Sequence, residues 1–128
     1  MKQHSINQYK RTEVATADQG KLILMMYDGA IKFVEIAKNK LRENDMAGKG
    51  IYISKAQGII SELMASLNME GGGEIALSLE KLYAFMNRQL RIANVNKDIK
   101  PLDSVAKILG ILREGWVEIL QKPLNFSS

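Results

Sequence analysis

Residues 52–67 read YISKAQGIISELMASL, a stretch without proline in which apolar side chains recur at helical spacing. Projected at 100° per residue, these side chains fall within one arc of about 140°, the width that a helix buries in a bundle core. They are Tyr52, Ile53, Ala56, Ile59, Ile60, Leu63, Met64 and Leu67. The stretch therefore predicts an amphipathic helix with one buried face.

Three further segments repeat this period, and none shows the alternation of a half-buried strand. The connections between segments are short, which favours antiparallel neighbours, and the similar lengths indicate an up-down order. We therefore predict an all-α fold, an antiparallel four-helix up-down bundle with a flexible N-terminal segment. The predicted helices cover residues 18–43, 46–68, 73–96 and 101–122.

Capping residues support these limits. Asp18 or Thr16 can cap the first helix and Asp45 the second, because short polar side chains accept bonds from the free N–H groups of a first turn. Pro101 suits the first turn of the fourth helix. We expect three parts, a flexible N-terminal segment (1–17), the bundle (18–122) and a C-terminal tail (123–128).

The composition excludes most catalytic and metal chemistry. The 128 residues include no cysteine and one histidine, His4, so the chain cannot build a disulfide framework, a thiolate zinc site or a histidine triad. We expect no enzymatic activity, no metal and no cofactor. No stretch resembles a signal peptide or approaches the roughly 20 apolar residues of a membrane span. The cytoplasm is the expected compartment, without membrane insertion.

The formal net charge is +4 and the isoelectric point is near 9.3, so nucleic acid must be considered as a partner. Basic residues are interleaved with acids, as in the pairs Asp28/Lys32 and Asp103/Lys107, which have the favourable spacing of four residues. We interpret most charges as a solvated face and do not expect nucleic-acid binding. A small basic helical nucleic-acid-binding regulator remains the alternative function.

Two of the predicted helices have a simple core face. The core seam of the third helix consists of Ile75, Leu79, Leu82, Met86, Leu90 and Ala93. The fourth helix places its core residues in an arc of about 120°. They are Leu102, Val105, Ile108, Leu109, Leu112, Trp116, Ile119 and Leu120. Trp116 is accordingly expected to be a core residue.

The first and third predicted helices carry more apolar surface than one core can cover. On the first, apolar side chains spread over about 240°. The third has a second apolar strip among Lys81 and Arg88, formed by Leu77, Phe85, Ile92 and Val95. Exposed apolar strips mark partner sites, grooves or oligomer contacts. Scattered exposed residues with irregular packing, or a homodimer that covers the strips, are the alternatives.

Four glycines lie inside predicted helices, at Gly29, Gly58, Gly110 and Gly115. Each costs roughly 1 kcal/mol relative to alanine, so a compensating benefit is expected. Close approach of helix backbones is one interpretation, and space for the backbone of a ligand is the other. The run Gly71–Gly73 is interpreted as a helix–helix turn, because no strand precedes it and no Gly-Lys-Ser/Thr follows it.

Several stretches together carry a resemblance to a known family. The first stretch is KLILMMYDGAI at residues 21–31. The second predicted helix contributes Lys55-Ala56-Gln57, Ile60, Glu62, Leu63 and Ser66-Leu67. The later matches are Gly72 to Ala76, Leu82-Tyr83 with Met86, Ala93-Asn94, and Leu112-Arg113-Glu114 with Trp116. In this order and spacing, from about Tyr9 to Leu120, the chain resembles the flagellin export chaperone family, FliS. Two positions depart from the usual family pattern, Asp18-Gln19 in place of Ser-Pro and Gly115 in place of alanine.

The resemblance implies a cytoplasmic helical bundle that is not an enzyme and binds newly made flagellin. In the family, the disordered C-terminal segment of flagellin wraps the bundle, which blocks premature polymerisation. The chaperone also assists delivery to the export gate of the flagellar type III secretion apparatus. A co-chaperone as a further partner is left open. A ligand that folds on binding needs long apolar grooves, which agrees with the surplus apolar strips.

Some candidate site residues follow from the resemblance. Ile6 and Tyr9 match the family's N-terminal segment, which can form a lid over the cargo groove; a frayed tail is the alternative. Tyr27 and Asp28 fall in the most recognisable motif. They either contact cargo or serve as an edge-of-core aromatic and a solvated partner of Lys32.

Projection of the third helix adds Phe85 and Ile92 to the candidates. The full predicted partner-binding set is Ile6, Tyr9, Leu22, Met25, Tyr27, Asp28, Ile31, Leu77, Lys81, Phe85, Arg88 and Ile92.

Overall fold

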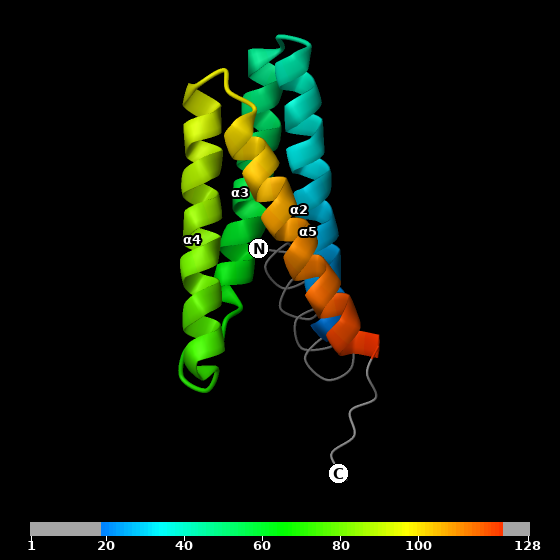
Figure 1. The fold of residues 1–128 in the computed structure, drawn as a ribbon, viewed down its shortest axis with the longest axis vertical. Coiled ribbons are helices and arrows are strands. Elements are labelled where there is room, and N and C mark those ends of the chain that lie inside the picture. Colours follow the sequence, from blue (N-terminus) through cyan, green and yellow to red (C-terminus); the bar gives the residue numbers. More distant parts are fainter. Residues whose placement is uncertain (1–18, 122–128) are drawn as a thin grey trace, which may run out of the picture.

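The computed structural model describes residues 19–121, whose helices lie side by side and run alternately up and down (Figure 1). These are α2 (Gln19–Arg42), α3 (Met46–Ala65), α4 (Gly73–Val95) and α5 (Lys100–Gln121). No strand occurs within the described range. The predicted all-α four-helix bundle is confirmed, and each helix begins and ends within three residues of its predicted limits. The candidate caps of the first helix, residues 16 and 18, lie outside the described residues.

Each helix packs against its two neighbours in a ring. α2 contacts α3 and α5, and α4 also contacts α3 and α5, so α2 and α4 lie diagonally opposite each other. In Figure 1, α5 begins beside the upper end of α4 and ends near the lower end of α2. The lower parts of α4 and α5 therefore diverge. The outward sides of α2 and α4 face different sides of the bundle.

The turn between α2 and α3 is tight because its residues suit their positions. The N–H of Asn44 donates to the carbonyl of Leu41 at 3.0 Å. The N–H of Asp45 donates to the carbonyl of Lys40 at 2.8 Å, which completes the paired bonds of a Schellman motif. Asn44 has φ of 61°, a conformation that asparagine tolerates better than most residues. The Asp45 carboxylate then accepts from the N–H of Gly48 at 2.9 Å, so the predicted cap of this helix is confirmed.

A single core receives apolar side chains from all four helices. Its buried members are Tyr27, Ala30, Val34, Ala37, Ile53, Ala56, Ile60, Leu63, Tyr83, Met86, Leu90, Ala93, Leu102, Val105 and Leu109. Most were expected from the helical projections. Tyr83 was not, although it is only 2% exposed.

Three predicted core positions are wrong. Ile75 is 75% exposed, Ile119 is 54% exposed and Leu120 is 41% exposed. Ile75 lies in the first turn of α4, and Ile119 and Leu120 lie in the last turn of α5. These are the ends at which α4 and α5 diverge, so neither helix covers the other there (Figure 1).

Trp116 joins the end of α5 to the start of α2. Its indole N–H donates to the carbonyl oxygen of Gly20 at 2.8 Å. The ring packs against the core but is only half-buried. The expected core role of Trp116 is therefore confirmed in part, since the ring also sits at the rim of the bundle.

Three of the four helical glycines singled out in the sequence do not mark close helix packing. A Cβ atom added at Gly29 would lie 3.2 Å from Cδ1 of Ile59, which is a tight contact with a side chain. A Cβ atom added at Gly58, Gly110 or Gly115 would meet no other atom within 4 Å among the described residues. Close backbone approach is therefore wrong for these three glycines, and their cost has no packing benefit.

The two expected charge pairs within helices are replaced by pairs between helices. Asp28 of α2 accepts from the guanidinium of Arg113 of α5, and this bond raises the pKa of Arg113. Asp103 of α5 pairs with Lys38 of α2 at 2.9 Å, which raises the pKa of Lys38. In both cases the carboxylate bonds a neighbouring helix instead of the lysine one turn later. The expectation failed because spacing within a helix cannot reveal a better cation on another helix.

Lys49 is a buried cation, only 2% exposed, that ties α3 to the end of α4. Its Nζ donates to the carbonyl oxygens of Ala93 at 2.9 Å and Asn96 at 3.0 Å. Carbonyls at a helix C-terminus lack internal partners and carry partial negative charge, so a cation is favourable there. Burial, together with the nearby charge of Lys97, lowers the pKa of Lys49.

Candidate partner-binding surface

Most of the predicted partner-binding residues that are exposed lie on the outward side of α4. Leu77 is 45% exposed and Ile92 is 40% exposed, and Lys81 and Arg88 are exposed as well. Phe85 is half-buried and packs against the core, and the guanidinium carbon of Arg88 lies 5.8 Å from the centre of its ring. Phe85 is thus partly buried against the core and partly accessible, whereas the projection predicted a fully exposed side chain.

The predicted residues of α2 divide between surface and core. Met25 is 67% exposed. Leu22 and Ile31 are half-buried, and Ile31 packs against the core. Among the described residues of α2, Met25 is therefore the one large apolar side chain that is exposed.

Tyr27 lies in the core, where it is 4% exposed. Its hydroxyl oxygen is 2.5 Å from that of Tyr83, and burial raises the pKa of both phenols. Of the two roles left open for Tyr27, its burial favours the structural one. Asp28 beside it is exposed but bonded to Arg113, so it is available to a partner only at the cost of that pair.

Ile6 and Tyr9 lie outside the described residues, and their lid role stays a prediction. Within residues 19–121, no group of three or more histidines or acids could hold a metal ion, and no helix is long and apolar enough to cross a membrane.

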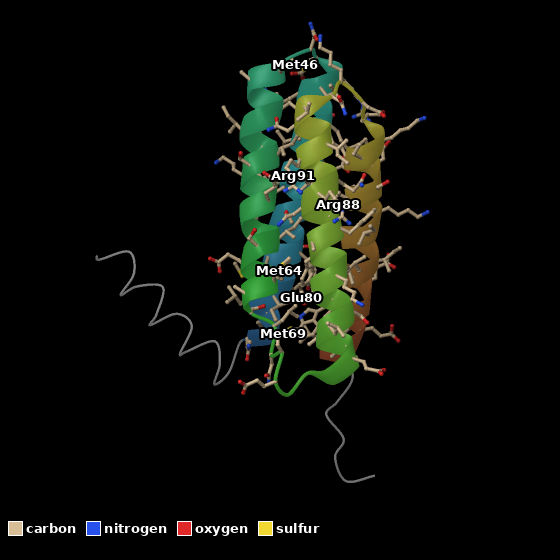
Figure 2. The ribbon with its side chains drawn as sticks, turned by 90° about the vertical axis from the view of Figure 1, so that its left-hand side faces the viewer. Met46, Met64, Met69, Glu80, Arg88 and Arg91 are labelled. Carbon is tan, nitrogen blue, oxygen red and sulfur yellow. The ribbon has the colours of Figure 1, made fainter. Side chains whose placement is uncertain are left out.

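Exposed residues outside the predicted partner-binding set also lie on α4 and α5. Val95, at the end of α4, is 80% exposed, although it was expected in the second strip without being chosen as a site residue. Ile111 of α5 is 61% exposed. Arg91 is exposed on α4 close to Arg88 (Figure 2). The signal that could have found Arg91 is the complete lack of acidic residues between Lys81 and Lys97.

The accessible residues lie on two sides of the bundle. Met25 belongs to α2, whereas Leu77 and Ile92 belong to α4, and these two helices lie diagonally opposite each other. The fold defines a class, an antiparallel four-helix bundle with exposed apolar side chains on diagonally opposite helices.

The chain belongs to the FliS family. The family model described as "Flagellar protein FliS" matches residues 1–123. The chain is 34% identical over 119 residues to the flagellar secretion chaperone FliS of Bacillus subtilis. The matched region covers 93% of this chain and 88% of that protein. The chain is 38% identical over 110 residues to the protein of the same name from Salmonella typhimurium, covering 85% of this chain and 82% of the relative. The resemblance inferred from the sequence is confirmed. Membership of this family supports a role as a flagellar secretion chaperone.

Proposed function

We propose that the protein is a cytoplasmic chaperone, without catalytic activity, for the disordered C-terminal segment of flagellin. Binding keeps this segment from polymerising before export. The chaperone then assists delivery of its cargo to the export gate of the flagellar type III secretion apparatus. The observation that carries the proposal is exposed apolar surface on diagonally opposite helices, at Met25 on α2 and at Leu77, Ile92 and Val95 on α4.

This arrangement suits a ligand that is unfolded when free. A segment without its own core can extend around two sides of a bundle and bury apolar side chains at each strip. Ordering the segment on binding costs conformational entropy, which offsets part of the free energy gained from a long interface. The resulting moderate affinity suits cargo that must later be released. An amphipathic helix laid into an apolar groove is a common way to meet such a surface.

Isothermal calorimetry with the isolated C-terminal segment of the cognate flagellin tests the proposal. We expect about one segment per chaperone and a negative heat-capacity change, because apolar surface is buried. Circular dichroism should show that the mixture contains more helix than the separate components.

A scrambled segment of the same composition serves as the control, and it should not bind. The absence of heat and of a helix gain at high micromolar concentration would contradict the proposal. Light scattering of the free chaperone over a concentration series addresses the alternative, a homodimer that covers the strips. Mass that rises with concentration, without cargo binding, would favour that alternative.

The N-terminal segment is part of the same proposal. If Ile6 and Tyr9 belong to a lid that competes with cargo, deletion of residues 1–17 should strengthen cargo binding. If they form only a tail, the deletion should leave the affinity unchanged. Titration of the full chain and the shortened chain with the same segment distinguishes the two.

A further inference from the structure

The net charge of the chain is concentrated in one short segment. Residues 81–100 contain five basic residues and one acid, Asp98, which gives a net charge of +4. The whole chain has 18 basic and 14 acidic residues, so the remaining sequence holds 13 of each and is neutral. The five basic residues of the segment are Lys81, Arg88, Arg91, Lys97 and Lys100. The excess charge of the protein therefore lies on the later part of α4 and its connection to α5.

These cations are exposed and lack carboxylate partners among residues 19–121. From Lys81 to Arg91, ten residues of helix span about 15 Å along the axis. Figure 2 shows Arg88 and Arg91 along this part of α4. Arg88 is additionally placed over the ring of Phe85. Asp28 and Asp103 pair with cations across the α2–α5 contact, but no carboxylate of the described residues pairs with this row.

Apolar side chains accompany the cationic row. Leu77 is 45% exposed, Ile92 is 40% exposed and Val95 is 80% exposed, all on the same helix. A phosphate backbone would use the charges but would gain nothing from the exposed valine and isoleucine. A polypeptide with both carboxylates and apolar side chains would use both kinds of surface. The mixture favours a protein partner over nucleic acid.

We infer that the cationic row of Lys81, Arg88 and Arg91 binds an acidic stretch of the cargo. This stretch forms an amphipathic helix whose carboxylates face the row and whose apolar side chains lie on Ile92 and Val95. The inference rests on the proposed function and adds the chemistry of the cargo segment that α4 receives. Lys81, Arg88 and Arg91 are exposed. Exposed charges in an interface act chiefly on the association rate and on the choice of partner.

Charge reversal at one position tests this inference in the full chain. Arg91→Glu should weaken binding of the cognate flagellin segment about tenfold at about 50 mM salt, and the loss should shrink at about 500 mM salt because exposed charges are screened. Arg42→Glu is the matched control, since Arg42 is exposed near the end of α2 and bonds only Asn39 of the described residues. It changes the net charge equally and should alter the affinity by less than about twofold. Lys81→Glu provides a second position if Arg91→Glu does not fold, as judged by circular dichroism.

Reversal on the cargo side identifies the contact. Replacing an acid of the flagellin segment by lysine should weaken binding to the parent chain and restore binding to Arg91→Glu. Equal affinities of Arg91→Glu and Arg42→Glu, with cargo binding intact, would overturn the inference and leave the proposed function standing. Failure of the parent chain to bind the segment at any salt concentration would overturn both. Loss of duplex-DNA binding in Arg91→Glu, with unchanged cargo affinity, would assign the row to nucleic acid instead.

Discussion

Tyr27 and Tyr83 meet across the centre of the bundle, with their hydroxyl oxygens 2.5 Å apart although 56 residues separate them in the sequence. They belong to α2 and α4, the diagonally opposite helices. Each phenol supplies the polar partner that the other needs inside an otherwise apolar core, since a buried hydroxyl without a hydrogen bond costs free energy. The pair therefore links the two diagonal helices directly through the core.

Replacing one tyrosine of this pair should cost more than replacing both. Tyr83→Phe leaves the hydroxyl of Tyr27 buried without a partner, and we expect a loss of about 1 to 3 kcal/mol in the free energy of unfolding. The double variant Tyr27→Phe with Tyr83→Phe should recover part of this loss, because no orphan remains. Urea unfolding of the two single variants and the double variant measures the coupling. Additive losses would mean that the hydroxyls do not depend on each other.

Stability should fall at alkaline pH because of the same two residues. Burial raises the pKa of Tyr27 and Tyr83 above the ordinary value of 10.0, so the folded chain keeps protons that the unfolded chain loses as the pH rises past 10.0. The native state then binds more protons than the unfolded state, and the free energy of unfolding decreases with rising pH. Urea midpoints from about pH 9 to pH 11 should show this decrease. The double phenylalanine variant, whose lysines are unchanged, should show a shallower one.

Trp116 should contribute to stability mainly through contacts at the rim of the core. Because the ring is half-buried, Trp116→Ala is expected to cost about 2 to 3 kcal/mol, below the range for a fully buried tryptophan. Trp116→Phe keeps a ring but removes the donor to the Gly20 carbonyl, and should cost about 1 kcal/mol. Denaturant unfolding of both variants measures these losses. A stability close to that of the parent, with a large loss of cargo affinity, would place Trp116 in the binding surface instead.

Alanine at the open helical glycines should stabilise the chain. Gly58→Ala and Gly115→Ala each meet open space, so each should raise the free energy of unfolding by about 0.5 to 1 kcal/mol. Gly29→Ala is the matched control, and its gain should be smaller because the new methyl group meets Ile59 at 3.2 Å. Thermal melts compare the three variants. If the stabilised variants lose cargo affinity, the glycines instead leave space for the backbone of the ligand.

The exposed end of the α4 strip offers a clean separation of folding from binding. Ile92→Ser combined with Val95→Ser removes side chains that are 40% and 80% exposed, so the free energy of unfolding should change by less than about 1 kcal/mol. Cargo affinity should fall at least about tenfold, since the exposed parts of the two side chains together lose burial worth roughly 1.5 kcal/mol or more. Cargo titrations and urea melts of the same variant give both numbers. Phe85→Ser is unsuitable for this purpose because Phe85 packs against the core.

Much of the functional surface depended on features that a helical projection does not contain. The projection correctly indicated exposed surface at Leu77 and Ile92. It also assigned Phe85 to the surface, but that ring is half-buried under Arg88. A projection gives the direction of a side chain from its own helix. It does not give the position of the neighbouring helix or the length over which the two helices touch.

The sequence by itself determined the helices, the Asp45 cap and the family, because these depend on residues close together or on their order along the chain. Only the tertiary structure decided that Tyr27 bonds Tyr83, that Asp28 bonds Arg113, and that the ends of α4 and α5 leave Ile75 and Ile119 uncovered. These outcomes depend on which helices lie side by side and where they diverge. That arrangement is set by the packing of the whole core, and so it cannot be obtained from the spacing within any one helix.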